Sequence, residues 1–153
     1  MNSITLKVAD LNDIGNIGKI ETECFSEPWS ENAIREFISH NENTILCAYS
    51  DNELCGYVSE TKVLDEIQIA NVAVSQKFRR CGIASLLIEA LINKCHSQSI
   101  AFMTLEVRKS NMPAIKLYEK YNFRPEGIRK NYYRNPTEDA IIMNRNFNKG
   151  IWK

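Results

Sequence analysis

The sequence lacks the features that would indicate a membrane, secreted or metal-binding protein. No apolar run within its 153 residues approaches the length of roughly 18 residues that is needed to span a membrane. The start, MNSITLKVADLND, has no basic segment followed by an apolar one, so we expect no secretory signal. The two histidines, His40 and His96, lie far apart without ligand partners at zinc-like spacing, so we expect no metal site. These absences predict a cytoplasmic protein that does not associate with membranes.

Cysteine is present, but without a disulfide or redox pattern. The five cysteines are odd in number, and no two form a CxxC pair. Without an export signal, reduced thiols are the default expectation. Cys47 and Cys55 flank a short polar turn and could face each other across a hairpin. A disulfide between them is therefore an alternative to two small buried thiols.

The sequence also lacks net charge, because 19 basic residues balance 19 acidic ones. Proteins that bind nucleic acid in bulk are usually basic, so we expect no direct nucleic-acid contact. The chain is 44% hydrophobic and 25% charged, which is typical of a globular protein with a real core. No repeat, linker or low-complexity segment divides it. We expect one domain over residues 1–148 and a short tail over 149–153.

Hydrophobic periodicity predicts a mixed α/β fold in which helices flank a mostly antiparallel sheet. The expected order is strand, two helices, three strands, helix, strand, helix and two strands. Short turns at 51–52 and 64–66 separate the three central strands. Ser30 and Asn111 are typical helix N-caps, and Asn122 favours a left-handed helix exit. The central strand–helix–strand unit predicts a right-handed crossover between two parallel strands.

One loop contains a single glycine between a predicted strand and a predicted helix, FRRCGIAS at residues 78–85. The helix start would direct free N–H groups and a positive dipole end into this loop. Gly82 lets the backbone approach a ligand, and Arg79 and Arg80 add charge. A diphosphate would fit here, although an ordinary turn explains the same residues. The missing glycines disfavour a GxGxxG dinucleotide site and a GxxxxGK[ST] ATP site.

The segment RRCGIA, residues 79–84, resembles the R/Q-x-x-G-x-G/A motif of the GCN5-related N-acetyltransferase superfamily. Further segments are similar to the bacterial ribosomal-protein-alanine N-acetyltransferases of that superfamily: FSEPWSENAIREF, NVAVSQKFRRCGIASLLIEALI, LEVRKSNMPAIKLYEKYNF, GIRKNYY and EDAIIMNRNF. The resemblance implies the fold of that superfamily and acetyl-CoA as co-substrate. It also implies direct acetyl transfer, in a ternary complex, to the N-terminal alanine of a small-subunit ribosomal protein.

The resemblance further implies how acetyl-CoA is bound. Loop amides would hold its pyrophosphate, and the backbone of the preceding strand would hold the pantetheine arm and the thioester oxygen. The implied cofactor-binding residues are Val72, Ala73, Val74, Arg79, Arg80, Cys81, Gly82, Ile83, Ala84, Ser85 and Asn111. Asn111 is also typical of a helix cap, and the two roles could coexist. Cys81 suggests an acetyl-cysteine intermediate, but no histidine adjoins it to activate the thiol, and the family transfers directly.

Glu106 and Tyr118 are the candidate catalytic residues. Glu106 lies in a strand-like run that is otherwise largely apolar or neutral, where it could also be a half-exposed edge residue or a partner of Arg108. Tyr118 lies on an apolar helical face, which is typical of a core aromatic. The resemblance implies that Glu106 is the general base and Tyr118 the general acid toward the CoA thiolate. A single carboxylate suffices as base because an α-amine titrates near 8, against about 10.4 for lysine.

Four aromatic residues are candidates for the acceptor groove, although each could be an ordinary core or surface residue: Phe25, Trp29, Tyr132 and Tyr133. Two rival functions remain open. The same fold could acetylate other protein N-termini or a small-molecule amine, or it could bind acyl-CoA without catalysis. Glu106 and Tyr118 argue against the second rival, because a pure binder needs neither. We expect a monomer or a weak homo-oligomer.

Overall fold

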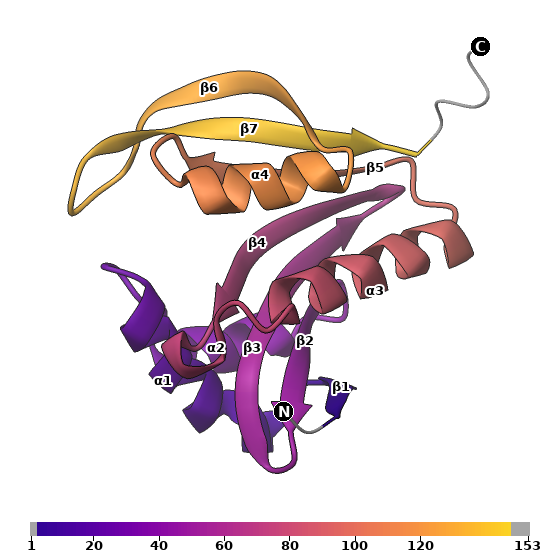
Figure 1. Cartoon of the computed structure of the whole chain (residues 1–153). Helices are drawn as coiled ribbons and strands as arrows, with labels where there is room; N and C mark the ends of the chain where they lie inside the picture. The colour runs from indigo at the N-terminus through magenta and orange to yellow at the C-terminus, as the bar shows by residue number, and fades with distance from the viewer. Residues whose placement is uncertain (1–2, 148–153) are drawn as a thin grey trace. The chain divides into compact units, whose positions relative to one another are not determined.

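Residues 3–147 are described by the structure, a computed structural model. A seven-stranded sheet runs through them in the order β1-β2-β3-β4-β5-β7-β6 (Figure 1). The strands are β1 (Ile4–Val8), β2 (Asn43–Ser50), β3 (Glu53–Val63), β4 (Glu66–Val74), β5 (Phe102–Arg108), β6 (Arg124–Tyr133) and β7 (Glu138–Asn146). The helices are α1 (Ile14–Cys24), α2 (Glu31–Ile38), α3 (Ile83–Ser97) and α4 (Met112–Lys120), with short 3-10 segments η1 (Leu11–Asp13) and η2 (Gln76–Phe78).

The predicted element order and fold class are both confirmed. β4 pairs with β5 in parallel, from Glu66 with Phe102 to Gln68 with Thr104. The pairs β1–β2, β2–β3, β5–β7 and β6–β7 are antiparallel. The helix α3 connects these two parallel strands along the chain, as the central strand–helix–strand pattern predicted. The predicted boundary at residue 148 and the tail at 149–153 lie outside the described residues.

Two compact units make up this single α/β domain. The described part of unit 1 is residues 3–61 and 70–90, and that of unit 2 is residues 62–69 and 91–147. Each unit has its own packed interior and carries its own share of the candidate residues.

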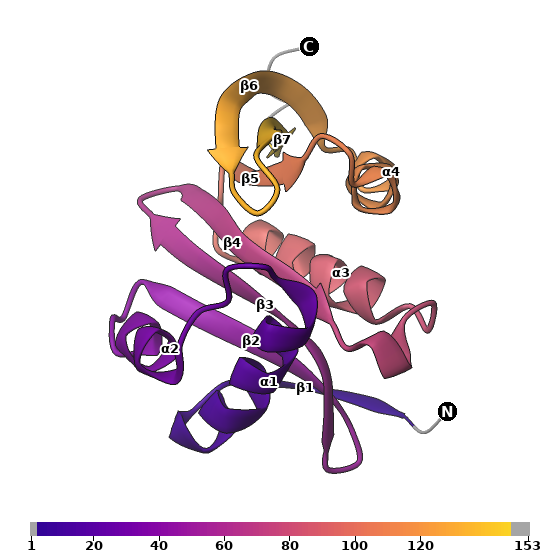
Figure 2. The same ribbon diagram turned by 90° about the vertical axis from the view of Figure 1, so that its left-hand side faces the viewer.

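In unit 1, α1 and α2 lie on one face of β2 and β3 (Figure 2). Ile14, Ile17 and Ile20 follow a helical spacing along α1, and all three are buried against this face. Burying each such side chain contributes roughly 1.5–3 kcal/mol. The start of α2 is fixed by Ser30, whose Oγ accepts a hydrogen bond from the N–H of Ala33 at 3.0 Å, as predicted.

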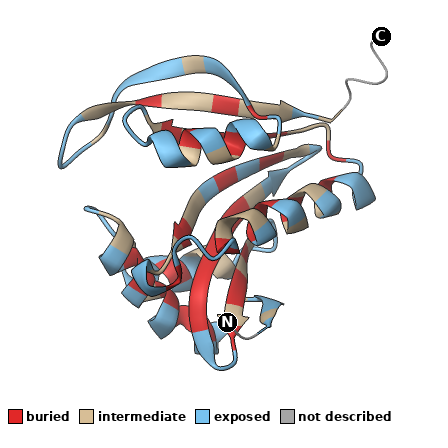
Figure 3. Ribbon diagram, viewed as in Figure 1, coloured by how far each residue is buried: buried red, intermediate tan, exposed pale blue. Residues whose placement is uncertain are grey.

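In unit 2, burial alternates along β5. Met103, Leu105 and Val107 are buried, while the intervening side chains, including that of Glu106, are only partly covered. Figure 3 colours the ribbon by how far each residue is buried. The start and the end of α4 were also predicted correctly. The Oδ1 of Asn111 accepts from the N–H of Ala114 at 3.3 Å, and after the helix Asn122 has a φ of 68°.

The disulfide alternative is wrong. All five cysteines are free. Cys47 is opposite Tyr57 in the β2–β3 register, and a register shift between Ala48 and Tyr49 separates it from Cys55. Burial raises the pKa of the Cys47 thiol to about 12, so it behaves as a small apolar side chain.

No helix within residues 3–147 combines the length and the apolar character needed to cross a membrane. Within the same residues, no three His, Cys, Asp or Glu side chains are grouped so that they could hold a metal ion.

Candidate active site

In unit 1, the predicted cofactor loop connects the end of β4 to the start of α3. The N–H of Ser75 donates to the carbonyl of Cys55 on β3 at 2.8 Å. The carboxylate of Glu23, on α1, accepts from the backbone N–H of Gln76. Phe78 is buried beneath the loop. These contacts fix where the strand ends and where the loop begins.

The two arginines of the loop have different surroundings. The Nε of Arg79 donates to the carbonyl of Val74 at 3.3 Å, and its Nη2 lies 3.6 Å from the Sγ of Cys24. Burial raises the pKa of the Cys24 thiol, and Arg79 partly opposes that effect. Arg79 thus stabilises the end of β4 through its hydrogen bond to Val74. The side chain of Arg80 is exposed, and within residues 3–147 it has no hydrogen bond or ion pair, so it is available to an anionic ligand.

Gly82 gives the loop its shape and leaves space beside it. Its φ is +79°, a conformation that residues with a side chain rarely adopt. A Cβ built at Gly82 would meet no atom within 4 Å, so the protein itself does not fill this position. The first-turn N–H groups of α3, at Ile83, Ala84 and Ser85, have no partner within the helix. An open approach next to free N–H groups fits the pyrophosphate of acetyl-CoA.

Gly56, on β3, positions the predicted cofactor strand, although it was not among the residues predicted from the sequence. A Cβ at Gly56 would lie 2.6 Å from the carbonyl oxygen of Ala73 and 3.2 Å from the Cα of Val74. Ala73 is buried, while Val72 and Val74 are partly covered. Only glycine therefore lets the end of β4 pack this closely on β3. A glycine inside a strand pattern was the one available signal.

Replacement of Gly56 with Ala is expected to displace the backbone at Ala73 and weaken acetyl-CoA binding by about tenfold or more, because a site displaced by about 1 Å loses most of its complementarity. Isothermal titration calorimetry with acetyl-CoA measures this. Gly15→Ala is the matched control, since a Cβ there meets nothing within 4 Å. Unchanged affinity in Gly56→Ala would show that this packing does not set the binding strand.

In unit 2, Glu106 forms an ion pair with Arg129 of β6. The Nε of Arg129 lies 2.9 Å from the Oε2 of Glu106, whose side chain is 26% exposed. The alternative that Glu106 pairs with Arg108 is wrong. Arg108 instead pairs with Glu138 at 3.2 Å. The second oxygen of Glu106, Oε1, has no recorded partner in the described chain and is left to accept a hydrogen bond.

Arg108 holds the turn between β6 and β7, a role that the sequence did not indicate. Its guanidinium donates to the carbonyls of Arg134 and Pro136, both at 2.9 Å, in the turn between β6 and β7. It also lies over the ring of Tyr133 at 4.5 Å. Glu138 completes the arrangement by accepting from the N–H of Ser110 at 2.6 Å. The pKa of Glu138 is lowered first by the side chain of Ser110 and then by this backbone hydrogen bond and by Arg108.

Tyr118 is 7% exposed and packs against Phe123, with 5.7 Å between the ring centroids. Burial raises the pKa of its phenol above the usual value, and the nearby Tyr133 adds to the effect. Within residues 3–147 the hydroxyl of Tyr118 has no hydrogen-bond partner. Its oxygen is nevertheless not fully buried, so a ligand can reach it. The hydroxyl therefore stays protonated and can donate to a ligand.

Two of the predicted acceptor aromatics lie near Glu106 in unit 2. Tyr132 and Tyr133 contact each other edge to face at 5.0 Å. Burial raises the pKa of Tyr133 to about 12, and the charge of Glu106 is among the smaller causes. Arg129 lies over the ring of Tyr132 at 5.9 Å. Glu106, Arg129 and this tyrosine pair thus form one polar and aromatic cluster.

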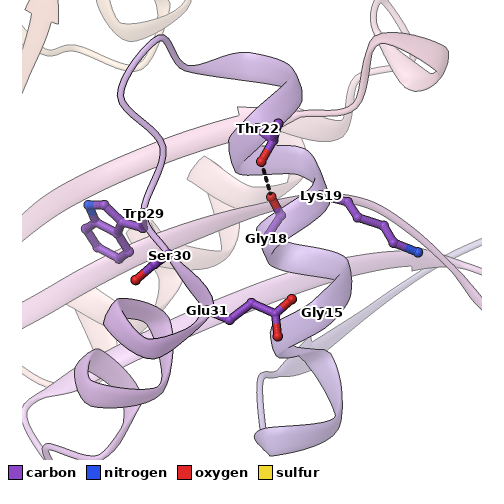
Figure 4. A pocket seen from close by; sticks show the side chains of 7 residues that line it. All are labelled: Gly15, Gly18, Lys19, Thr22, Trp29, Ser30 and Glu31. Atoms are coloured by element: carbon purple, nitrogen blue, oxygen red, sulfur yellow. Dashed lines mark hydrogen bonds between the residues drawn. The ribbon is translucent and has the colours of Figure 1, made fainter.

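The other two aromatics, Phe25 and Trp29, lie in unit 1 and pack against its apolar core. Trp29 contacts Phe37 with ring centroids 5.1 Å apart. It also lines a cavity of about 430 Å³ between α1 and the start of α2 (Figure 4). The remaining lining residues are Gly15, Gly18, Lys19, Thr22, Ser30 and Glu31.

The chain is similar to acetyltransferases over nearly its whole length. A profile described as the acetyltransferase (GNAT) family matches residues 15–123. A protein of Salmonella typhimurium named ribosomal protein bS18-alanine N-acetyltransferase is 35% identical over 144 residues, which cover 91% of this chain and 95% of that protein.

Solved structures of acetyltransferases are also similar to this chain. The crystal structure of the ribosomal-protein-S18-alanine N-acetyltransferase from Escherichia coli has a TM-score of 0.88 and 31% identity, with 94% of each chain covered. Arabidopsis thaliana NAA60 in complex with acetyl-CoA has a TM-score of 0.86 and covers 95% of this chain and 99% of its own, and at 19% identity it shows the fold alone. The chain belongs to the acetyltransferase (GNAT) family.

Proposed function

We propose that the protein transfers the acetyl group of acetyl-CoA to the N-terminal alanine α-amine of a small-subunit ribosomal protein, by direct attack in a ternary complex. The observation that carries this proposal is the 35% identity, over 91% of the chain, to an enzyme named for that acceptor. The cluster around Glu106 supports it. We assign the activity to residues 1–148 and propose that the enzyme acts in the cytoplasm.

Several residues would hold acetyl-CoA, which supplies the acetyl group as a thioester. The first-turn N–H groups of α3 and the side chain of Arg80 suit its negatively charged phosphates. The backbone of Val72, Ala73 and Val74 is the proposed contact for the acetyl end. Asn111 uses its Oδ1 to cap α4, which leaves its Nδ2 as a donor for the ligand.

Glu106 is the proposed general base. An α-ammonium group titrates near 8, so about one amine in ten is already neutral at pH 7, against fewer than about one in a thousand for lysine. The carboxylate also attracts the positively charged amine before the proton leaves. Arg129 fixes the side chain through Oε2, and Oε1 would receive the proton directly or through a water molecule.

Tyr118 is proposed to stabilise the departing thiolate by donating a hydrogen bond. The pKa of Tyr118 is raised above the ordinary value of 10.0, whereas a thiol titrates near 8.5. Complete proton transfer from the phenol would therefore cost at least about 2 kcal/mol, at 1.36 kcal/mol for each pH unit. A hydrogen bond to the developing charge avoids that cost.

Peptides of identical sequence that begin with Ala, Ser or Met test the acceptor. We expect the Ala peptide to have the highest kcat/KM, and we expect no product from an N-terminally blocked peptide whose only amine belongs to lysine. With the Ala peptide, kcat/KM should rise with pH through about 8, as the α-amine loses its proton, and then level off. Measurement of CoA release gives these constants.

Other results would favour the rival functions. Acetylation of the lysine peptide alone would contradict N-terminal transfer. Equal rates for all three N-termini would indicate a less selective acetyltransferase. Tight acetyl-CoA binding without turnover of any peptide or small amine would indicate an acyl-CoA-binding module.

A further inference from the structure

A buried carboxylate in unit 1 takes no part in the chemistry proposed above. Glu21, on α1, is 1% exposed. Its Oε1 accepts from the backbone N–H of Trp29 at 2.8 Å. Its Oε2 accepts from the Nδ2 of Asn71 at 3.0 Å and from the hydroxyl of Tyr57. The three donors come from the α1–α2 loop, β4 and β3.

This arrangement is unusual for its position on the helix. The neighbouring Ile17 and Ile20 are buried in an apolar core, and an apolar residue would continue their face. A buried carboxylate is costly unless donors satisfy it. Here every contact is a donor, which is what an ionised carboxylate requires. The three contacts therefore indicate a role in holding segments in place rather than in adding apolar stability.

The carboxylate of Glu21 and its three donors form a hydrogen-bond network with two arms. One arm, through Asn71, reaches the proposed acetyl-CoA strand. The side chain of Asn71 contacts Glu21, and its backbone N–H donates to the Oγ of Ser59 at 3.0 Å. Asn71 directly precedes Val72 and is thus held by two side chains. Its position sets where the stretch 72–74 begins.

The other arm reaches the loop that carries two of the candidate acceptor aromatics. The N–H of Phe25 donates to the backbone carbonyl of Glu21 at 2.9 Å, and the N–H of Trp29 donates to its side chain. The indole ring of Trp29 packs on Phe37, and Trp29 is among the residues that line the cavity between α1 and the start of α2 (Figure 4). Releasing this N–H would free the loop to move while leaving its apolar contacts in place.

We propose that Glu21 is a positioning residue that fixes the α1–α2 loop and the β4 segment at Asn71 against one another. A single carboxylate then fixes the positions of both the α1–α2 loop and the proposed acetyl-CoA strand, so a change at Glu21 displaces the two together. The inference rests on the proposed function for the meaning of those two segments. The inference does not depend on which amine is acetylated.

The variant Glu21→Gln tests this inference. Glutamine has one acceptor oxygen and must direct its NH₂ group at a donor, so at least one arm loses its acceptor. We expect faster amide hydrogen exchange in residues 25–30, in 70–74 or in both. We also expect a decrease in kcat/KM for the Ala peptide of about tenfold or more, typical of a site displaced by about 1 Å. The affinity for CoA should change less than kcat/KM, because the pyrophosphate loop is held separately by Glu23 and Cys55.

Two further variants keep the test decisive. Glu42→Gln is the matched control, since it removes an exposed carboxylate of unit 1 and should leave exchange and kinetics unchanged. Asn71→Ala cuts only the β4 arm and replaces Glu21→Gln if that variant does not fold. It should lower kcat and quicken exchange in 70–74 without quickening it in 25–30.

Three outcomes separate the hypotheses. Unchanged exchange in both segments of Glu21→Gln would overturn the inference. Faster exchange together with wild-type kcat and KM would also overturn it, because the network would then be purely structural. If the wild-type enzyme acetylates no N-terminal peptide, the proposed function fails, whereas the exchange data still report whether Glu21 positions both segments.

Discussion

The variant Glu106→Gln is expected to lower kcat by about 10²- to 10⁴-fold, the usual contribution of a general base. Glutamine has nearly the same shape and can still accept a hydrogen bond from Arg129, but it cannot take the proton of the attacking amine. The affinity for acetyl-CoA should be unchanged, since the loop that would bind it belongs to unit 1. Steady-state kinetics with the Ala peptide and calorimetry with acetyl-CoA measure the two effects.

A matched control separates loss of the base from general loss of negative charge in unit 2. Glu119 is an exposed carboxylate on α4, and Glu119→Gln should retain the wild-type kcat. A Glu106→Gln enzyme that keeps most of its activity would show that the amine loses its proton to water or to another group. A variant in which only KM rises would instead make Glu106 a binding residue for the ammonium group.

The variant Tyr118→Phe is expected to lower kcat by about 10- to 100-fold, because a hydrogen bond to a charged group contributes about 1.5–3 kcal/mol. The ring should keep its contact with Phe123 at 5.7 Å. Because the hydroxyl has no recorded partner among residues 3–147, its removal should leave the free energy of unfolding almost unchanged. Peptide kinetics and a thermal unfolding curve measure the two quantities.

The pH dependence provides an independent check on Tyr118. Its raised pKa keeps the phenol protonated up to and beyond pH 10, so this group should cause no loss of rate at lower pH. Tyr121→Phe removes a hydroxyl close to the end of the same helix and should retain the wild-type kcat. If Tyr118→Phe loses stability but not kcat, the residue is only a core aromatic.

Local features of the sequence were sufficient to predict the fold. Ser30, Asn111 and Asn122 mark helix ends through contacts or backbone conformations that involve only nearby residues, and each was predicted correctly. The positive φ of Gly82 follows from the same kind of local chemistry. The catalytic and binding roles of the site residues stay predictions.

Contacts between distant segments could not be predicted in the same way. Arg108 is two positions from Glu106 on the same face of β5, and it was the natural candidate for an ion pair. The partner of Glu106 is Arg129, which the pairing of β6 with β7, and of β7 with β5, brings alongside. A sequence does not reveal that register, because it depends on a turn and a register shift between Arg129 and Tyr133.

Buried polar groups were missed for a related reason. Glu21 follows the apolar series Ile14, Ile17 and Ile20 along α1, and an acidic residue in such a helix is usually assigned to the solvent side. Its donors on Tyr57 and Asn71 lie 36 and 50 positions away. Only the packed structure shows that this carboxylate is enclosed.

The exposure of the cysteines has a practical consequence for measuring ligand binding. Cys81 is exposed within the proposed pyrophosphate loop, while Cys24 is half-buried and Cys47, Cys55 and Cys95 are buried. A thiol-reactive fluorophore should therefore attach first at Cys81 in the native chain, without engineering of the other thiols. Acetyl-CoA should slow that labelling if it occupies the loop, and labelling at an unchanged rate would contradict the assignment. The wild-type protein would thus report on its own ligand through the rate of a colorimetric or fluorescent thiol reaction.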